Sequence, residues 1–77
     1  MSDQIKIKFD KWFEINEHQT DILNNLKNTI AALRSSPDDK QLQQMSEWYH
    51  KELKIVSKQN DEALTALNKA MSHNPTA

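Results

Sequence analysis

The residues of this chain that come closest to a catalytic motif are Glu47 and His50, in the stretch Glu47-Trp48-Tyr49-His50. On a helix, residues three positions apart lie on one face. Two such E-x-x-H motifs, with two further glutamates, build the di-iron sites of four-helix bundles. A dimer of a helical hairpin would supply two of these motifs, so a metal-binding bundle is one hypothesis for this chain.

The metal hypothesis needs further carboxylates at the same level of the neighbouring helix. In an antiparallel hairpin that turns near residue 36, Glu47 faces Asn25 and Leu26, and neither side chain is acidic. We therefore expect no metal site and no other cofactor, and keep the metal-binding bundle only as a distant third alternative.

The remaining histidines do not indicate catalysis either. His18 lies beside Glu14 and Asp21 on the outer side of a predicted helix, and His73 lies in the C-terminal tail. Neither histidine has a serine or cysteine partner that would make a nucleophile. The chain contains no glycine, which excludes a glycine-rich phosphate loop. We expect a protein that is not an enzyme and has no small-molecule substrate.

Composition limits the partners further. The chain has 77 residues, with 10 Lys and Arg against 11 Asp and Glu, so it lacks the cationic surplus that nucleic-acid binding requires. Three lysines alternate with apolar residues over positions 6–13, as at a membrane surface, but Asp10 and Glu14 weaken that pattern. No segment approaches the roughly 20 apolar residues of a membrane span. We expect neither nucleic acid nor a membrane as partner.

The compartment follows from similar arguments. The opening MSDQIKIKFD has no apolar run suited to a signal peptide, and the absence of cysteine suits a reducing compartment. We therefore expect a cytoplasmic protein, or one exported without a cleaved signal peptide.

Pro37 marks the turn in a chain that otherwise reads as helical. Proline is favoured at the first position of a helix, and Ser36 before it is a good N-cap, with Asp39 completing a weak capping box. Apolar residues recur at spacings of three and four on both sides of this point. The pattern predicts one all-α domain over 1–77, an antiparallel, coiled-coil-like two-helix hairpin about 40–50 Å long. Its parts are helices over about 8–34 and 37–71, a turn at 35–36 and a frayed tail at 72–77.

The stretch from Ile5 to Phe9 alternates apolar and basic residues with period two, which is typical of a strand. A lone strand of five residues has no partner in such a hairpin. We expect this stretch to be an extended or frayed lead-in that becomes ordered on a partner.

Each predicted helix carries more apolar residues than one seam can bury. The main stripe of the first helix holds Ile15, Ile22, Leu23, Leu26, Ile30 and Leu33, and that of the second holds Leu42, Tyr49, Leu53, Val56, Leu67 and Met71. Trp48 and Ile55 share a line about 100° from the second stripe. The first possibility is that this line binds a partner, and the alternative is that Trp48 folds back over the seam. A partner, or a second copy, would complete the small core.

The predicted contact with another helical protein or with a second copy comprises Met45, Trp48 and Ile55, with Phe13, Phe9 and Trp12. Charges are also one-sided. Acidic residues line the outside of the first helix (Asp10, Glu14, Glu17 and Asp21), and lysines line that of the second (Lys40, Lys51, Lys54, Lys58 and Lys69). These are either solvated faces or faces on which successive copies dock.

The stretch SSPDDKQLQQM resembles the turn of small helical hairpins from bacterial type III secretion systems, the needle subunits and their co-chaperones. In needle subunits a proline, two small polar residues, a second proline and a leucine join the helices. Pro37, Asp38, Asp39 and Leu42 match this motif, and Lys40 stands at the second proline. The chain ends in LNKAMSHNPTA where needle subunits have an apolar helix, which favours a soluble partner-binding role.

The resemblance implies a co-chaperone or structural subunit of a secretion apparatus that binds other subunits through its helices. The alternative is a small cytoplasmic or phage-encoded regulator that binds and inhibits a target protein.

Overall fold

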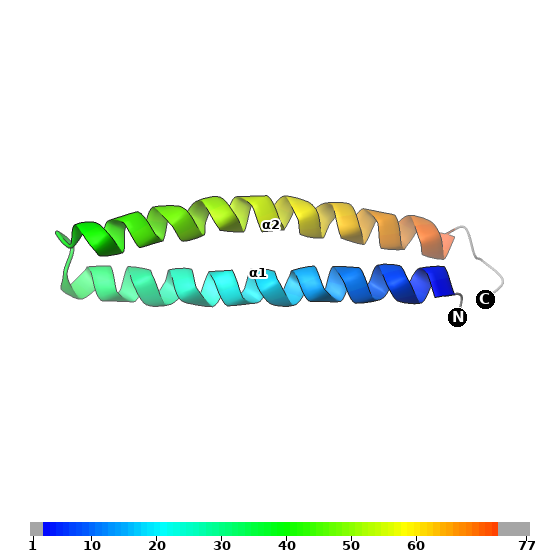
Figure 1. Cartoon of the computed structure of the whole chain (residues 1–77), viewed down its shortest axis with the longest axis horizontal. Helices are drawn as coiled ribbons and strands as arrows, with labels where there is room; N and C mark the ends of the chain where they lie inside the picture. Colours follow the sequence, from blue (N-terminus) through cyan, green and yellow to red (C-terminus); the bar gives the residue numbers. More distant parts are fainter. Residues whose placement is uncertain (1–2, 73–77) are drawn as a thin grey trace.

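A computed structural model of the chain describes residues 3–72, and these residues form two long helices. Helix α1 spans Asp3–Ser35 and helix α2 spans Lys40–Ser72, with 33 residues each. The helices lie side by side and run in opposite directions, so the two ends of the hairpin are the turn and an open end where α1 begins and α2 ends (Figure 1). The predicted all-α, antiparallel hairpin is confirmed.

The turn occupies residues 36–39. The Ser36 carbonyl oxygen accepts a hydrogen bond from the Asp39 N–H at 3.1 Å, which closes a β-turn with Pro37 at its second position. The side chain of Asp39 then accepts a hydrogen bond from the Leu42 N–H at 3.1 Å. Asp39 is therefore the N-cap of α2.

The sequence prediction placed the turn at 35–36, with Ser36 as the cap and Pro37 as the first helical residue, and these assignments were wrong. Ser36 uses its backbone in the β-turn, and the fixed φ of Pro37 suits the second position of that turn. The start of α2 moves to Lys40, three residues later than predicted. The predicted end of the first helix near residue 34 differs from the observed Ser35 by one residue.

Helix α1 begins at Asp3 rather than near residue 8, and the predicted extended lead-in is helical. Ile5 lies buried in the seam, whereas Ile7 is largely exposed. The stretch resembles a strand because Ile5 and Ile7 are both apolar, but on the helix they lie on different faces. Ile5 lies one heptad before Trp12 on the buried line, whereas Ile7 points outward. A helix also satisfies the backbone hydrogen bonds of this stretch, which an unpaired strand would leave open.

At the other end, Ser72 is the last residue of α2, one position beyond the predicted end. The predicted frayed tail otherwise falls on residues 73–77, which include His73 and lie outside the described part of the chain. The hairpin measures 58 × 15 × 13 Å, longer than predicted because α1 starts earlier.

The seam follows a seven-residue repeat on both helices, as in a coiled coil. Residues that lie at equal distances from the turn oppose one another, and every seam position is buried or half-buried. The α1 positions are Ile5, Lys8, Trp12, Ile15, Gln19, Ile22, Leu26, Thr29 and Leu33, and the α2 positions are Leu42, Ser46, Tyr49, Leu53, Val56, Asn60, Ala63, Leu67 and Ala70.

A polar layer interrupts this apolar seam near the middle of the hairpin. Asn60 is only 9% exposed, and its side-chain oxygen accepts a hydrogen bond from the Trp12 indole N–H at 3.1 Å. Its amide nitrogen donates to Asn16 Oδ1 at 3.1 Å and to Gln19 Oε1 at 2.8 Å. Gln19 in turn donates to Ser57 Oγ at 3.0 Å. A buried asparagine in a coiled-coil seam selects one register, because other registers leave it without partners.

Three residues assigned to the main apolar stripes lie outside the seam. Leu23 and Ile30 of α1 and Met71 of α2 are 39%, 47% and 46% exposed. All three lie on lines next to the seam, where two helices alone do not cover them. The buried core is correspondingly small, and no side chain of residues 3–72 is completely sealed from solvent.

Replacing Asp39 with alanine should lower the free energy of unfolding by about 1 kcal/mol, because the Leu42 N–H loses its acceptor. Ser36→Ala is the matched control and should change it by less than about 0.5 kcal/mol. Urea unfolding followed by circular dichroism measures both values. A larger effect of Ser36→Ala than of Asp39→Ala would contradict the observed cap.

Replacing Asn60 with alanine should lower the free energy of unfolding by about 1–3 kcal/mol, since three polar partners lose a buried hydrogen bond. Asn68→Ala, on the exposed side of the same helix, provides the control and should unfold at nearly the wild-type urea concentration. Equal stability of the two variants would show that the polar layer does not stabilise this register.

Candidate partner-binding surfaces

The clearest exposed apolar surface lies on α2 toward the turn and consists of Met45, Trp48 and Ile55, which we call the turn-end strip. These residues are 38%, 57% and 53% exposed. The Trp48 ring contacts Tyr49 edge-on, with centroids 5.1 Å apart and planes at 72°. Because Tyr49 belongs to the seam, this contact positions the indole while leaving it open to solvent. The alternative in which Trp48 folds back to cover the seam does not hold.

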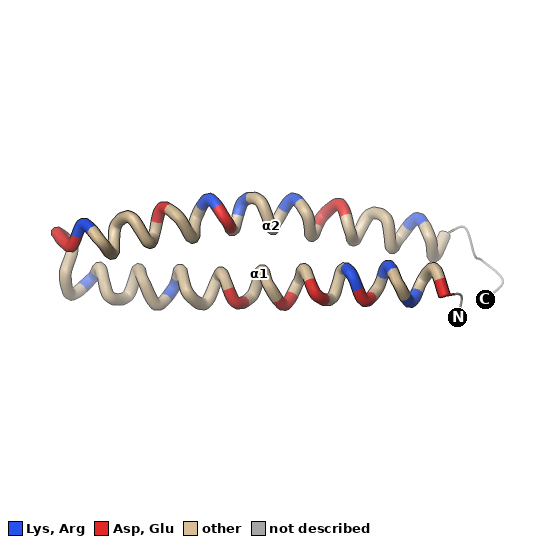
Figure 2. The backbone as a smooth tube through the Cα atoms, viewed as in Figure 1, with Lys and Arg blue, Asp and Glu red and all other residues tan. Residues whose placement is uncertain are grey.

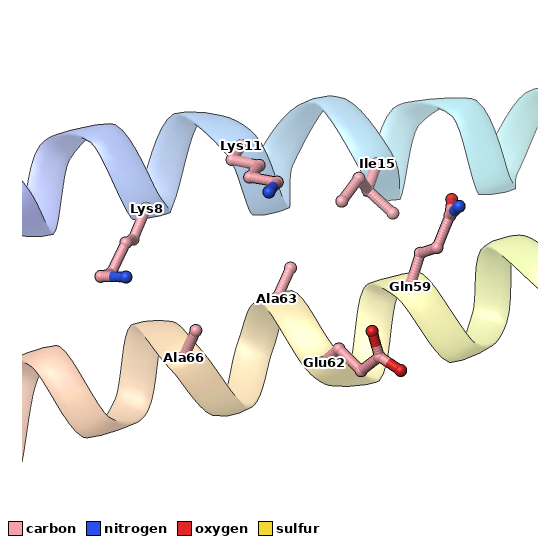
Figure 3. A pocket seen from close by; sticks show the side chains of 7 residues that line it. All are labelled: Lys8, Lys11, Ile15, Gln59, Glu62, Ala63 and Ala66. Atoms are coloured by element: carbon pink, nitrogen blue, oxygen red, sulfur yellow. The ribbon is translucent and has the colours of Figure 1, made fainter.

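The turn-end strip continues along one side of the hairpin toward a groove at the open end. The groove encloses about 410 Å³ and opens between α1 and α2 (Figure 3). Its lining consists of Lys8, Lys11, Ile15, Gln59, Glu62, Ala63 and Ala66. The small alanines leave space between the helices, and the rim carries charges of both signs. The groove therefore favours neither an anion nor a cation, and its apolar part, Ile15, Ala63 and Ala66, lies on the same side of the hairpin as the turn-end strip.

Phe9 and Phe13 form a second surface on the opposite side of the seam. Phe9 shares a line with Asn16, Leu23 and Ile30, seven residues apart, and Asn16 joins the polar layer from that side. The rings of Phe9 and Phe13 are stacked, with centroids 6.1 Å apart, and both are nearly half-exposed. Leu64 and Met71 lie on the same side of the seam at the same end. We call Phe9, Phe13, Leu64 and Met71 the aromatic end.

Trp12, the sixth predicted contact residue, belongs to neither surface. Its indole is half-buried in the seam, donates to Asn60 and contacts the Phe9 ring at a centroid distance of 5.8 Å. Trp12 therefore holds the two helices together.

The six predicted contact residues thus do not form one patch. Trp48 lies level with about residue 27 of α1, which places it roughly 25–30 Å along the hairpin from Phe9. The two surfaces also face opposite sides of the seam. Periodicity at 100° per residue identified the exposed line of Trp48 and Ile55, but it did not assign Phe9 and Phe13 to a side. Heptad positions counted from Trp12 would have separated these surfaces and added Leu64 and Met71.

Within residues 3–72, no group of three or more His, Cys, Asp or Glu side chains is placed to hold a metal ion. Glu47 and His50, the residues of the E-x-x-H motif, are both exposed on α2. His18 is exposed on α1.

No family model, curated protein or solved structure matches this chain. Among the described residues, neither helix combines the length and the hydropathy that crossing a membrane demands.

The two indoles should differ in their access to solvent. In the Trp12→Phe variant only Trp48 emits, and acrylamide should quench its fluorescence strongly, because this ring is 57% exposed. In the Trp48→Phe variant only Trp12 emits, and quenching should be weaker because the seam covers part of the ring. Stern–Volmer slopes measured on dilute protein check this order, and equal slopes would contradict the placement of Trp48 outside the seam.

Proposed function

We propose that this protein is a non-enzymatic interaction module whose hairpin packs against another helical protein. The observation that carries the proposal is the turn-end strip, three large apolar side chains on one helix that are open to water. Exposed apolar surfaces of this kind mark interaction sites when they are contiguous and rimmed by polar residues.

The shape of the hairpin supports the same proposal. Its accessible surface is 6044 Å², whereas a compact monomer of 9.0 kDa exposes about 4,900 Å². Its radius of gyration is 17.2 Å, against about 11–12 Å for a compact domain of this length. A rod of two helices has too little interior to shelter its apolar residues, and a helical partner laid along it would supply the missing cover.

The geometry of the turn-end strip favours a helix as the partner. Met45, Trp48 and Ile55 follow the spacing of one helix face, so an amphipathic helix lying beside α2 would meet all three. The groove farther along the same side would receive side chains of that helix beyond Ile55. Glu52 lies between Met45 and Ile55, and Gln59 lies beyond Ile55 at the groove; both would form part of the polar rim of the contact.

The resemblance to the hairpins of type III secretion systems gives this module its most specific identity, a co-chaperone or structural subunit of a secretion apparatus. The matching residues Pro37, Asp38 and Asp39 fall in the turn that joins the two helices, where that family carries its motif. A subunit of this kind would bind other helical subunits through its sides.

Replacing Trp48 with aspartate should abolish partner binding without unfolding the hairpin, because the indole is exposed and contributes little to the seam. Tagged wild-type and variant chains are incubated with extract of the source cell, and the retained proteins are compared by mass spectrometry. Ile30→Asp is the matched control, since Ile30 is 47% exposed at the same level of the hairpin but on the other side.

The expected result is a helical protein retained by the wild type and by Ile30→Asp but lost with Trp48→Asp, with unchanged helicity in circular dichroism. Loss of helicity in Trp48→Asp would place this residue in the core and refute the assignment of the surface. Retention of the same proteins by all three chains would refute the turn-end strip as the contact. The retained protein also separates a secretion subunit from the target of an inhibitory regulator.

A further inference from the structure

Part of the outer face of each helix carries charges of one sign, and the signs of the two parts are opposite; Glu47 and Glu62 lie at the two ends of the part on α2. An acidic stripe of Asp10, Glu14, Glu17 and Asp21 runs along α1, and a lysine stripe of Lys51, Lys54 and Lys58 runs along α2. In Figure 2 most of the red segments of α1 lie on the edge away from α2, and the blue segments of α2 lie on its far edge. All seven residues of the two stripes are exposed.

A single hairpin cannot pair these two stripes with each other. Both lie almost opposite the seam on their own helices, so the whole thickness of the two helices separates them. The pairing is possible only between different molecules, when α1 of one copy lies beside α2 of another.

The spacing of the stripes matches for such a contact. Asp10, Glu14 and Glu17 are separated by four and then three residues, and Lys58, Lys54 and Lys51 show the same intervals in the reverse direction. Antiparallel helices reverse the order of one chain relative to the other, so each of the three carboxylates lies at the axial level of one lysine. This register shifts neighbouring copies by one heptad, about 10 Å, along the hairpin axis.

We propose that the occupant of the outer face of α2 is the acidic stripe of a second copy of this chain, so that hairpins associate side by side. The inference rests on the proposed function in one respect, since it names a second copy as a helical partner. Trp48 and Ile55 flank the lysine stripe and Phe13 flanks the acidic stripe, so apolar side chains border the charged contact on both faces. The charges select the partner and the register, and the apolar residues add buried area.

The contact is head-to-tail, because it joins two different faces. Each added copy leaves one free acidic stripe and one free lysine stripe, so association continues instead of stopping at a dimer. The mean mass should therefore rise with concentration and fall with salt, because about 500 mM salt screens exposed charges within a few ångströms.

The test uses the purified full chain and mass measurement by light scattering. At low salt, about 10 mM, the mass of the wild type should rise above 9.0 kDa with concentration, and about 500 mM salt should return it to 9.0 kDa. The double variants E14K/E17K and K51E/K54E should each stay at 9.0 kDa at every concentration. An equimolar mixture of the two should regain association, since the lysines of one variant then face the glutamates of the other.

K27E/R34E is the matched control, since it changes the net charge as much as K51E/K54E does but lies outside both stripes. This control should associate as the wild type does. A monomeric wild type, a mixture that stays monomeric, or a control that loses association as fully as K51E/K54E would each overturn the proposal. None of these outcomes tests the proposed function of the turn-end strip. That function is tested by the Trp48→Asp experiment, which measures the loss of a retained helical partner.

Discussion

Antiparallel pairing along a single seam decides which side chains of this protein are sheltered. Every seventh residue, and the residue three positions after it, returns to the seam on α1, and the same repeat holds on α2. Side chains beside these positions stay exposed however apolar they are, as Leu23, Ile30 and Ile55 show. The two apolar surfaces and the two charged stripes are consequences of this constraint, because each occupies helix surface that a second helix does not reach.

The polar layer around Asn60 ensures that this seam closes in one alignment. Apolar residues such as Leu53, Val56 and Leu67 would still pack after a shift of one heptad. Exchanging one apolar side chain for another of similar volume costs little stability. Asn60 would then be separated from Trp12, Asn16 and Gln19, and its buried amide would lack partners. Trp12 and Ala63 lie opposite one another at one level of the seam. This pairing of a large side chain with a small one also favours this alignment, because opposing side chains must match in volume in a close-packed seam.

The architecture could be predicted from the sequence because helical periodicity and the absence of glycine both favour two long helices. The exposure of Trp48 could be predicted for the same reason, since its line lies far from the main stripe. The cap was misplaced because Ser36 and Asp39 both suit an N-cap, and only the backbone hydrogen bonds of the β-turn decide between them. The start of α1 was predicted too late because the alternation from Ile5 to Phe9 is compatible both with a strand and with the heptad positions of a helix. Trp12 was predicted to lie on a surface because periodicity describes one helix at a time. The residue that places its indole in the seam, Asn60, is 48 residues away in sequence.

The position of the turn also determines the order in which the seam closes during folding. The layer of Leu33 and Leu42 is joined by a short loop, whereas Ile5 and Ala70 are joined by almost the whole chain. Because loop-closure entropy grows with the length of the loop, we expect pairing to start at the capped turn and to proceed toward the open end. In the reverse direction we expect the layers at the open end to separate first, which would expose Phe9 and Met71 on the part that opens most readily and leave Trp48 on the part that opens last.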